Sequence, residues 1–82
     1  MKFYKDKYGL FYWYKILYRK LTAIYYNDKI VFYKNGKFNN NKNVAYIDDR
    51  IKSFCLDGKV YGTENDFNKK SWRKFVKLQA FL

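Results

Sequence analysis

Two hexapeptides decide the fold of this chain: FYKNGK at residues 32–37 and FCLDGK at residues 54–59. Each holds a dipeptide, Asn35-Gly36 or Asp57-Gly58, that suits the type I′ turn of a β-hairpin, because both central residues of that turn need a positive φ. The two glycines lie 22 residues apart, and aromatic and β-branched residues precede both turns. The sequence therefore predicts β-hairpins at a regular spacing.

The segments around these turns extend the pattern. Weaker turns of the same kind are predicted at Asn27-Asp28 and Asp48-Asp49, and Asn39-Asn40-Asn41 marks a longer polar loop. Short runs of strand-forming residues lie between the turns, at 23–26, 30–34, 44–47 and 51–56. The matching spacing and flanks indicate an internal repeat of two strands and a turn, stacked as an antiparallel meander.

Residues 10–21 are ambiguous between strand and helix. Leu10, Trp13, Leu17 and Leu21 fit one face of a helix, but residues 10–14 are dense in aromatic strand formers. The segment after them aligns with strand positions of the repeat. We therefore predict a strand here.

The C-terminal region changes to a helical pattern. Thr63 followed by Asp66 resembles a capping box, and Glu64 lies where the helix dipole favours an acid. Apolar or small residues then recur at helical spacing, with lysines and an arginine between them: Phe67, Ser71, Phe75, Leu78 and Leu82. We predict one amphipathic helix of about 12–16 residues within 63–80 that packs on one face of the sheet.

These elements define the expected fold class. It is α+β and mostly β: an antiparallel β-meander of about 5–7 short strands, built from β-hairpin repeats in residues 1–62, with one C-terminal amphipathic helix in residues 63–80. A chain of 82 residues is short for two domains, so residues 1–82 are expected to form a single one.

The hairpin pattern resembles a known type of repeat. Residues 32–37, the polar loop and Val44-Ala45-Tyr46-Ile47 are similar to the aromatic-Tyr-x-Asn-Gly-Lys hairpin repeats, loosely MORN-like, of small proteins from phages and large DNA viruses. The Asp57-Gly58-Lys59 turn followed by Thr63–Phe67 is similar to the ends of such arrays. The resemblance spans about residues 14–67. It implies a hairpin fold and a viral or mobile-element origin, and it brings no functional residues with it.

Composition allows two explanations of the charge. Lys and Arg number 18 against 7 Asp and Glu, a formal net charge of +11, and 24% of residues are aromatic. A positive field of this size attracts polyanions and speeds their capture. Lys, Asn, Tyr, Phe and Ile are also the residues that AT-rich codons encode, so a low-GC genome would produce the same composition without selection for a polyanionic partner.

The residues needed for catalysis are missing or otherwise explained. Histidine is absent, which removes the commonest general base and metal ligand. Cys55 is the only cysteine, and its apolar strand neighbours indicate a core thiol. Asp48-Asp49 and the other turn acids, Asp28 and Asp57, are interpreted as caps of backbone groups rather than a cation site. We therefore expect no enzyme, no metal, no cofactor and no small-molecule substrate.

The same features indicate a compartment. A lone cysteine excludes an intramolecular disulfide and favours a reducing environment. No run approaches the roughly 18 apolar residues of a membrane span. We expect a cytoplasmic protein without a membrane partner, located in the host cytoplasm if it is viral.

Binding hypotheses remain. The first is a small phage or mobile-element protein that binds a host protein or nucleoprotein, for example to inhibit a defence or nucleic-acid-processing machine. Its candidate anchors are aromatic: Tyr12, Trp13, Tyr14, Tyr33 and Tyr46. The alternative is direct, largely sequence-independent DNA or RNA binding, with basic residues on the phosphates: Lys15, Arg19, Lys20, Lys69, Lys70, Arg73, Lys74 and Lys77. A third is a structural subunit that pairs through open strand edges.

Overall fold

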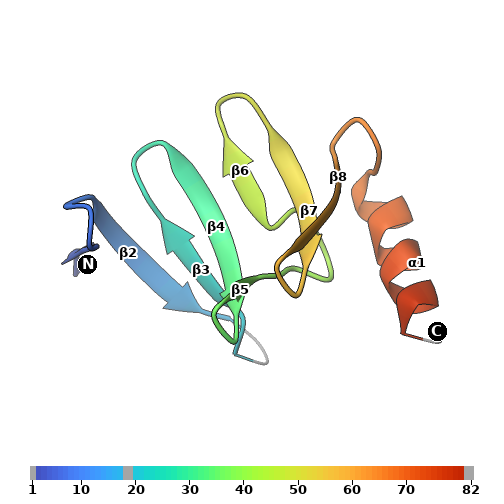
Figure 1. The fold of residues 1–82 in the computed structure, drawn as a ribbon, viewed down its shortest axis with the longest axis horizontal. Coiled ribbons are helices and arrows are strands. Elements are labelled where there is room, and N and C mark those ends of the chain that lie inside the picture. Colours follow the sequence, from blue (N-terminus) through green and yellow to red (C-terminus); the bar gives the residue numbers. More distant parts are fainter. Residues whose placement is uncertain (1, 18–19, 81–82) are drawn as a thin grey trace.

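A computed structural model describes residues 2–17 and 20–80 of the chain. The described residues form eight strands and one helix: β1 Tyr4–Lys5, β2 Phe11–Ile16, β3 Thr22–Tyr25, β4 Lys29–Lys34, β5 Lys37–Phe38, β6 Tyr46–Asp48, β7 Lys52–Leu56, β8 Lys59–Thr63 and α1 Lys69–Gln79 (Figure 1). All strand pairs are antiparallel, in the order β1-β2-β3-β4-β6-β7-β8, with β5 also paired to β4. The predicted mostly-β meander with one C-terminal helix is confirmed, and residues 11–16 form a strand.

The two hairpin turns adopt the expected conformation. Asn35 and Gly36 have φ of 53° and 76°, and Asp57 and Gly58 have φ of 49° and 83°. These positive values match the type I′ geometry that allows a two-residue connection between twisted strands. The first turn joins β4 to the two-residue strand β5, and the second joins β7 to β8, which has the same length as β7.

The weaker turns also connect strands, but they are not of the same kind. Neither Asn27-Asp28 nor Asp48-Asp49 is among the positive-φ residues of the described chain, so the expected turn type is wrong there. The second turn is stabilised by the Asp48 carboxylate rather than by residues with positive φ. Oδ1 of Asp48 accepts hydrogen bonds from the N–H groups of Arg50 and Ile51, both at 2.8 Å.

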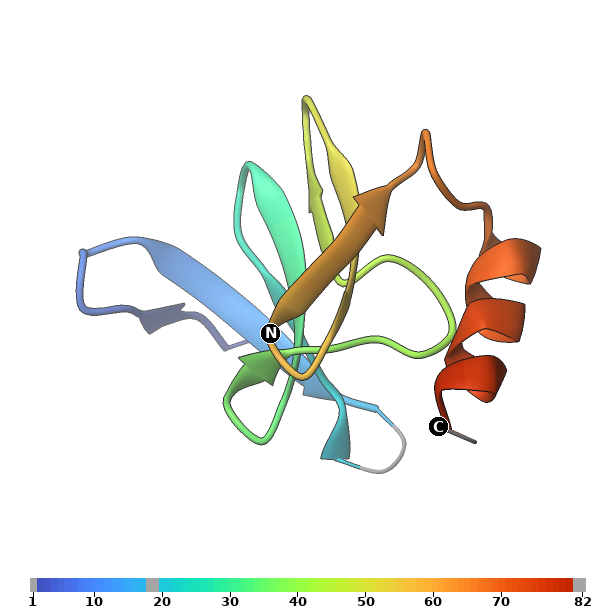
Figure 2. The same cartoon turned by 45° about the vertical axis from the view of Figure 1, so that its right-hand side comes forward.

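The loop after β5 is longer than its sequence suggested. Val44 and Ala45 were predicted to open a strand, yet β6 begins at Tyr46. The reason is buried Asn40, whose Nδ2 donates to the carbonyl of Val44 at 3.0 Å and whose Oδ1 accepts from the N–H of Lys42 at 3.0 Å. Figure 2 shows this loop leaving the sheet and reaching α1.

The helix starts later than predicted. Its N-cap is Asn68, whose Oδ1 accepts from the N–H of Ser71 at 2.8 Å, while Oγ of Ser71 accepts from the N–H of Asn68 at 2.9 Å. The Thr63–Asp66 pair forms a separate turn, in which Oδ2 of Asp66 accepts from the N–H of Thr63 at 2.9 Å. Because β8 extends to Thr63 and pairs there with Ser53, the chain has to turn before a helix can begin.

The packing face of the helix also differs from the expected one. Trp72, which is not part of the apolar series predicted from helical spacing, is fully buried, and Leu78, which is part of it, is 58% exposed. Trp72 packs with Val44 and Phe54, and Nε1 of Trp72 donates to the carbonyl of Asn40 at 2.8 Å. Half-buried side chains surround this core: Ile47, Leu56, Tyr61, Phe67, Phe75 and Val76. The helix therefore covers the β6–β8 end of the sheet and the loop. Leu82 lies outside the described residues.

Candidate functional site

Strand register divides the sheet into two sides. One row of directly opposed residues crosses the sheet from β2 to β7, with one residue from each of five strands: Trp13, Tyr25, Ile30, Ile47 and Lys52. Opposed residues project to the same face, and so do residues two apart along a strand. Phe54 therefore lies on the same face as Lys52, and its ring is 5.0 Å from that of Trp72 in α1. We call this face the helix side and the opposite face the tyrosine side.

The cations of the strands gather on the helix side. Register and alternation place six lysines there: Lys5, Lys15, Lys34, Lys37, Lys52 and Lys59. All are exposed except half-buried Lys34. The strands carry one further lysine and one acid, Lys29 and Asp48, which oppose each other on the tyrosine side. The helix side of the strands therefore holds positive charge and no carboxylate.

The exposed face of α1 is also basic. Its sequence, KKSWRKFVKLQ, contains five cations and no acid: Lys69, Lys70, Arg73, Lys74 and Lys77. At about 100° per residue, these five fall within one arc of about 140°, opposite the face that holds Trp72, Phe75 and Val76. All five are exposed. The predicted basic stripe is thus confirmed as a geometric feature of the helix.

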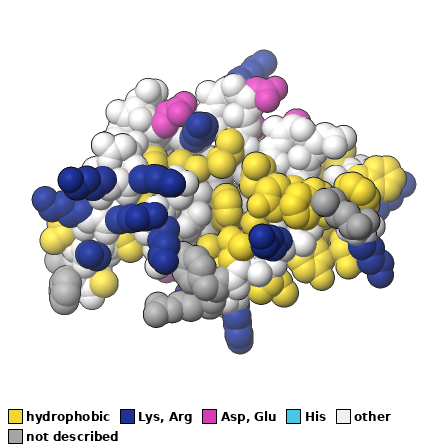
Figure 3. All heavy atoms as spheres, turned by 180° about the vertical axis from the view of Figure 1, so that it is seen from behind, with side chains coloured by type: hydrophobic (Ala, Val, Ile, Leu, Met, Phe, Trp, Pro, Cys, Tyr) yellow, Lys and Arg dark blue, Asp and Glu magenta, His cyan; other side chains and the backbone are white. Residues whose placement is uncertain are grey.

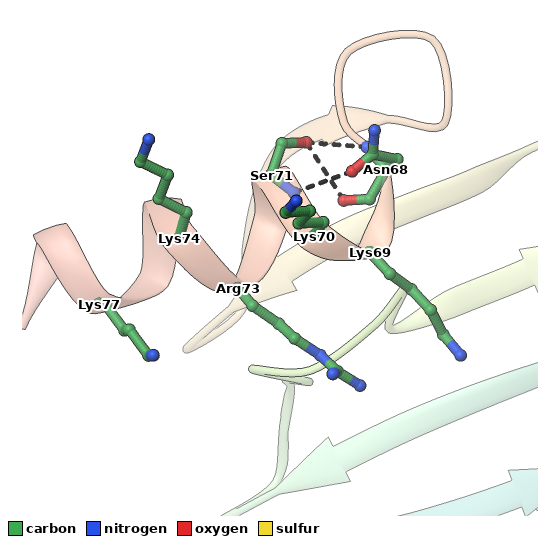
Figure 4. Close-up of a pocket in the computed structure, with 7 residues that line it drawn as sticks. All are labelled: Asn68, Lys69, Lys70, Ser71, Arg73, Lys74 and Lys77. Carbon is green, nitrogen blue, oxygen red and sulfur yellow. Dashed lines mark hydrogen bonds between the residues drawn. The ribbon is translucent and has the colours of Figure 1, made fainter.

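Long side chains on this arc enclose a shallow groove of about 610 Å³. Asn68 and Ser71 line it together with the five cations. Figure 4 shows Lys69, Arg73 and Lys77 extending from one flank of the helix, while Lys74 extends from the other. Nε of Arg73 donates to the carbonyl of Lys42 at 3.0 Å, so this cation also fastens the loop to the helix.

The first turn of α1 has an unusual charge. A helix N-terminus carries partial positive charge and is stabilised by acids, yet this first turn contains no acid and begins with Lys69 and Lys70. Two ammonium groups beside a positive dipole end cost local stability in the unbound protein. An anion bound at this position would remove that cost.

Acids occupy a different part of the surface. Six of the seven lie in turns outside the strands and helix: Asp6, Asp28, Asp49, Asp57, Glu64 and Asp66. In Figure 3, basic side chains gather over α1, hydrophobic side chains cover the middle of the molecule, and acidic side chains lie along its upper edge. The acids are therefore concentrated in turns, whereas α1 carries basic residues and no acid.

The tyrosine side carries six of the ten tyrosines: Tyr4, Tyr12, Tyr14, Tyr26, Tyr33 and Tyr46. Their rings form two contacting series. Tyr4 lies 5.7 Å from Tyr12 and 5.2 Å from Tyr14, and Tyr12 lies 5.6 Å from Tyr26. In the second series, Phe38 lies 4.8 Å from Tyr33 and 6.2 Å from Tyr46.

Four tyrosines of this side have a raised pKa. Burial raises the pKa of Tyr26 and of Tyr33. A hydrogen bond with Tyr4 raises the pKa of Tyr14, and one to Oδ2 of Asp48, at 2.8 Å, raises the pKa of Tyr46. At neutral pH these phenols are uncharged and can both donate and accept.

The structure separates the predicted aromatic anchors. Tyr12, Tyr14, Tyr33 and Tyr46 lie on the tyrosine side, whereas Trp13 lies on the helix side, where its ring stacks on Tyr25 at 3.9 Å. One flat partner surface cannot reach both sets. Among the predicted cations, Lys15 is on the helix side of β2, Lys20 is exposed beside the start of β3, and Arg19 lies outside the described residues.

Five helix-side lysines were missed as candidates: Lys5, Lys34, Lys37, Lys52 and Lys59. A signal for three of them exists in the sequence. A two-residue turn makes its flanking residues opposed partners, which pairs Lys34 with Lys37 around Asn35-Gly36 and Leu56 with Lys59 around Asp57-Gly58. The positions of Lys5 and Lys52 depend on longer connections.

The remaining reactive candidates have structural roles. Cys55 is buried and its burial raises the pKa of the thiol, which confirms the expected core cysteine. Three backbone and side-chain donors hold the pKa of Asp48 below its usual range, first among them the N–H of Arg50. Within residues 2–17 and 20–80, no three His, Cys, Asp or Glu side chains are grouped to hold a metal ion. In the same residues, no helix is long and apolar enough to cross a membrane.

Comparison with protein-family models, curated proteins and solved structures finds nothing that matches this chain. Its class is therefore defined by its own geometry: a small antiparallel β-meander with a basic helix packed over one end.

Proposed function

We propose that this protein is a non-enzymatic nucleic-acid-binding protein whose helix side contacts the phosphate backbone. One observation carries the proposal: six strand lysines and five cations of α1, eleven of the 18 Lys and Arg, lie on one side, and no strand residue of that side is an acid. Clustered Lys and Arg release counterions from phosphates, and this supplies most of the affinity of sequence-independent binding.

The distribution of the charge argues against codon bias as its full explanation. Biased codons enrich lysine along the whole chain, but they do not select alternate strand positions. Here the strands carry six lysines on one side and one, Lys29, on the other. Lys69 and Lys70 also stand where an isolated helix would favour acids, and a phosphate partner turns this cost into an attraction.

A host protein or nucleoprotein, with a phage or mobile-element origin, stays a hypothesis. Its aromatic anchors are divided between the two sides, while the cations are not, so the geometry favours nucleic acid as the partner. Pull-down from a cell lysate with and without nuclease separates the two. Loss of all partners after nuclease supports direct nucleic-acid binding, and a retained protein partner supports the host-protein hypothesis instead.

The direct test is a fluorescence anisotropy titration of labelled oligonucleotides over a salt series. If the five cations of α1 each neutralise one phosphate, the logarithm of the binding constant falls with the logarithm of salt concentration at a slope of about −4. Absence of binding by micromolar protein at about 0.1 M salt would overturn the proposal.

A pair of triple variants tests the location of the site. Lys69→Gln, Lys70→Gln and Lys74→Gln together are expected to reduce the slope by about 2–3 and to weaken binding strongly. Lys2→Gln, Lys7→Gln and Lys29→Gln remove the same charge at positions outside α1 and outside the helix-side strand positions, and should change the slope little. Equal losses in both variants would show that net charge alone attracts nucleic acid.

A further inference from the structure

The N-terminal half of the sheet is a single layer. The core around Trp72 draws its partners from β6, β7, β8, α1 and the adjoining loop, and none from β1 to β4. Figures 1 and 2 agree that α1 lies at the opposite end of the sheet from β1 and β2. Stable domains bury a sheet face against a second layer. Within the described residues, neither a helix nor a second sheet covers β2 and β3, although Ala23 of β3 is itself buried.

Exposed apolar side chains concentrate in this single-layer region. Of nine large hydrophobic residues that are exposed in the described chain, six lie between residues 3 and 16: Phe3, Tyr8, Leu10, Phe11, Tyr14 and Ile16. Tyr14 and Ile16 project to the tyrosine side, where Tyr14 is 44% and Ile16 is 66% exposed. Phe11 projects to the helix side, so the exposed apolar residues are divided between the two faces, and Tyr14 and Ile16 are those that a partner of the tyrosine side can contact.

Charge restricts which partner fits the tyrosine side. Its strands bear one cation and one anion, Lys29 and Asp48, which oppose each other and cancel. A nucleic acid therefore gains little there and is drawn to the helix side. Two copies of this chain, each of net charge +11, repel one another wherever their helix sides approach. The tyrosine side carries little net charge: Lys2 lies over the ring of Tyr4 and Asp6 lies beside Tyr26, in addition to the pair from the strands. It is therefore the broad sheet face on which two copies meet with the least repulsion.

The chemistry of this side is complementary to itself. Phenol hydroxyls both donate and accept hydrogen bonds, so identical tyrosine arrays can satisfy one another across a two-fold axis. Tyrosine is also enriched at protein interfaces, because it combines rigid apolar area with a polar tip. Packed sheets lie about 10 Å apart, so the outward lysines of the two copies are separated by more than the Debye length at physiological salt.

We propose that a second copy of this chain packs on the tyrosine side, so that the protein is a two-fold symmetric homodimer. Its two sheets lie face to face, and both helix sides point outward. A stable interface of standard size buries about 800 Å² on each partner, about one eighth of the 6442 Å² that this chain exposes. The dimer supplies the missing second layer for β2, β3 and β4, and it doubles the basic surface independently of what that surface binds.

The test is the solution mass, measured by sedimentation or by light scattering after size exclusion from about 1 to 100 µM protein. The expected mass is twice the 10.1 kDa of the chain. Tyr14→Lys places a charge in the interface and is expected to weaken the dimer about tenfold or more, because an unpaired charge would be desolvated. Phe11→Lys, on the same strand but on the helix side, is the matched control and should leave the dimer intact.

Each contrary result has a clear meaning. A monomer at every concentration overturns the proposal, and so does a dimer that Phe11→Lys disrupts as much as Tyr14→Lys. Circular dichroism of both variants excludes unfolding as the cause, and Tyr14→Asp is a second variant if Tyr14→Lys fails to fold. A monomer that binds a different protein through the tyrosine side would likewise replace the second copy as occupant. None of these results depends on nucleic-acid binding, so the two proposals can fail separately.

Discussion

The two ends of the sheet are built differently. At the C-terminal end, α1 covers β7 and β8, and Trp72 and Phe54 are 0% and 2% exposed. At the N-terminal end, the β1–β2 hairpin has no covering layer, and Phe11 and Ile16 are 62% and 66% exposed. The contrast teaches that this chain concentrates its intramolecular stability at one end. Aromatic side chains remain available for intermolecular contacts at the other end.

The largest expected effect comes from removing the centre of the covered end. Trp72→Ala deletes an indole that contacts Phe54, Tyr61, Phe67 and Phe75 and that donates to Asn40. It should lower the free energy of unfolding by about 3–5 kcal/mol, measured by urea denaturation. Trp13→Ala, at the uncovered end, loses chiefly its stack on Tyr25 and should cost about 1 kcal/mol. Similar losses of unfolding free energy in both variants would show that the two ends of the sheet contribute equally to stability.

The next effect tests the loop that joins the sheet to the helix. Asn40→Ala removes a buried amide that binds the carbonyl of Val44 and the N–H groups of Lys42 and Asn43. Its loss leaves buried backbone groups unsatisfied and should cost about 1–3 kcal/mol of unfolding free energy. Asn65→Ala, in an exposed turn, is the control and should change the free energy by less than about 0.5 kcal/mol. A null effect of Asn40→Ala would mean that the hydrogen bonds of Trp72 and Arg73 to the loop are sufficient to hold it.

A smaller effect tests where the helix begins. Asn68→Ala removes the side chain that caps the N–H of Ser71 and should cost about 1 kcal/mol. Asn68→Asp retains the capping oxygen and should keep the stability of the original protein. Thermal unfolding followed by circular dichroism measures both. If Thr63→Ala had the larger effect, the helix would start at the turn that the sequence first suggested.

The smallest expected effect is a dependence of stability on pH that arises from the tyrosine side. Burial raises the pKa of Tyr26 and Tyr33, so the folded state favours their neutral form. Their contribution to stability is complete below the ordinary tyrosine pKa near 10 and is lost as pH rises through the raised values. The unfolding midpoint should therefore fall between about pH 9 and 11. In the double variant Tyr26→Phe and Tyr33→Phe, the unfolding midpoint should fall less steeply with pH, because neither ring can ionise.

Local sequence was sufficient for the two hairpin turns that contain glycine and for the type of most elements, but it was wrong about the turn type at Asn27-Asp28 and Asp48-Asp49. Asn35-Gly36 and Asp57-Gly58 fix positive φ through residues that tolerate it, and this is independent of distant contacts. The strand at residues 11–16 and the existence of a terminal helix were also predictable. The helix start was not, because Thr63–Asp66 and Asn68–Ser71 both carry a capping signature. The pairing of Thr63 with Ser53 decided between them.

The candidate site was predictable in part. The five cations of α1 follow from helical periodicity, since no tertiary contact is needed to place them on one arc. Trp72 was misplaced because Phe67, Ser71, Phe75 and Leu78 also repeat at helical spacing. Only the contact with Phe54 and the acceptor at Asn40 select the face that contains Trp72, Phe75 and Val76.

The sequence by itself determined the hairpins and the net charge of +11. It also determined that adjacent Tyr and Lys residues, at Tyr4-Lys5, Tyr14-Lys15 and Tyr33-Lys34, project to opposite faces of their strands. Tertiary structure alone decided that the separate strands align these faces into one basic side and one tyrosine side. The physical reason is register: a shift of one residue between two strands would turn every side chain of one strand to the other face. Where a long connection such as the Asn39–Ala45 loop joins two strands, contacts distant in sequence hold the connection in place. For this loop, the main contacts are those that Trp72 makes with Asn40 and Val44.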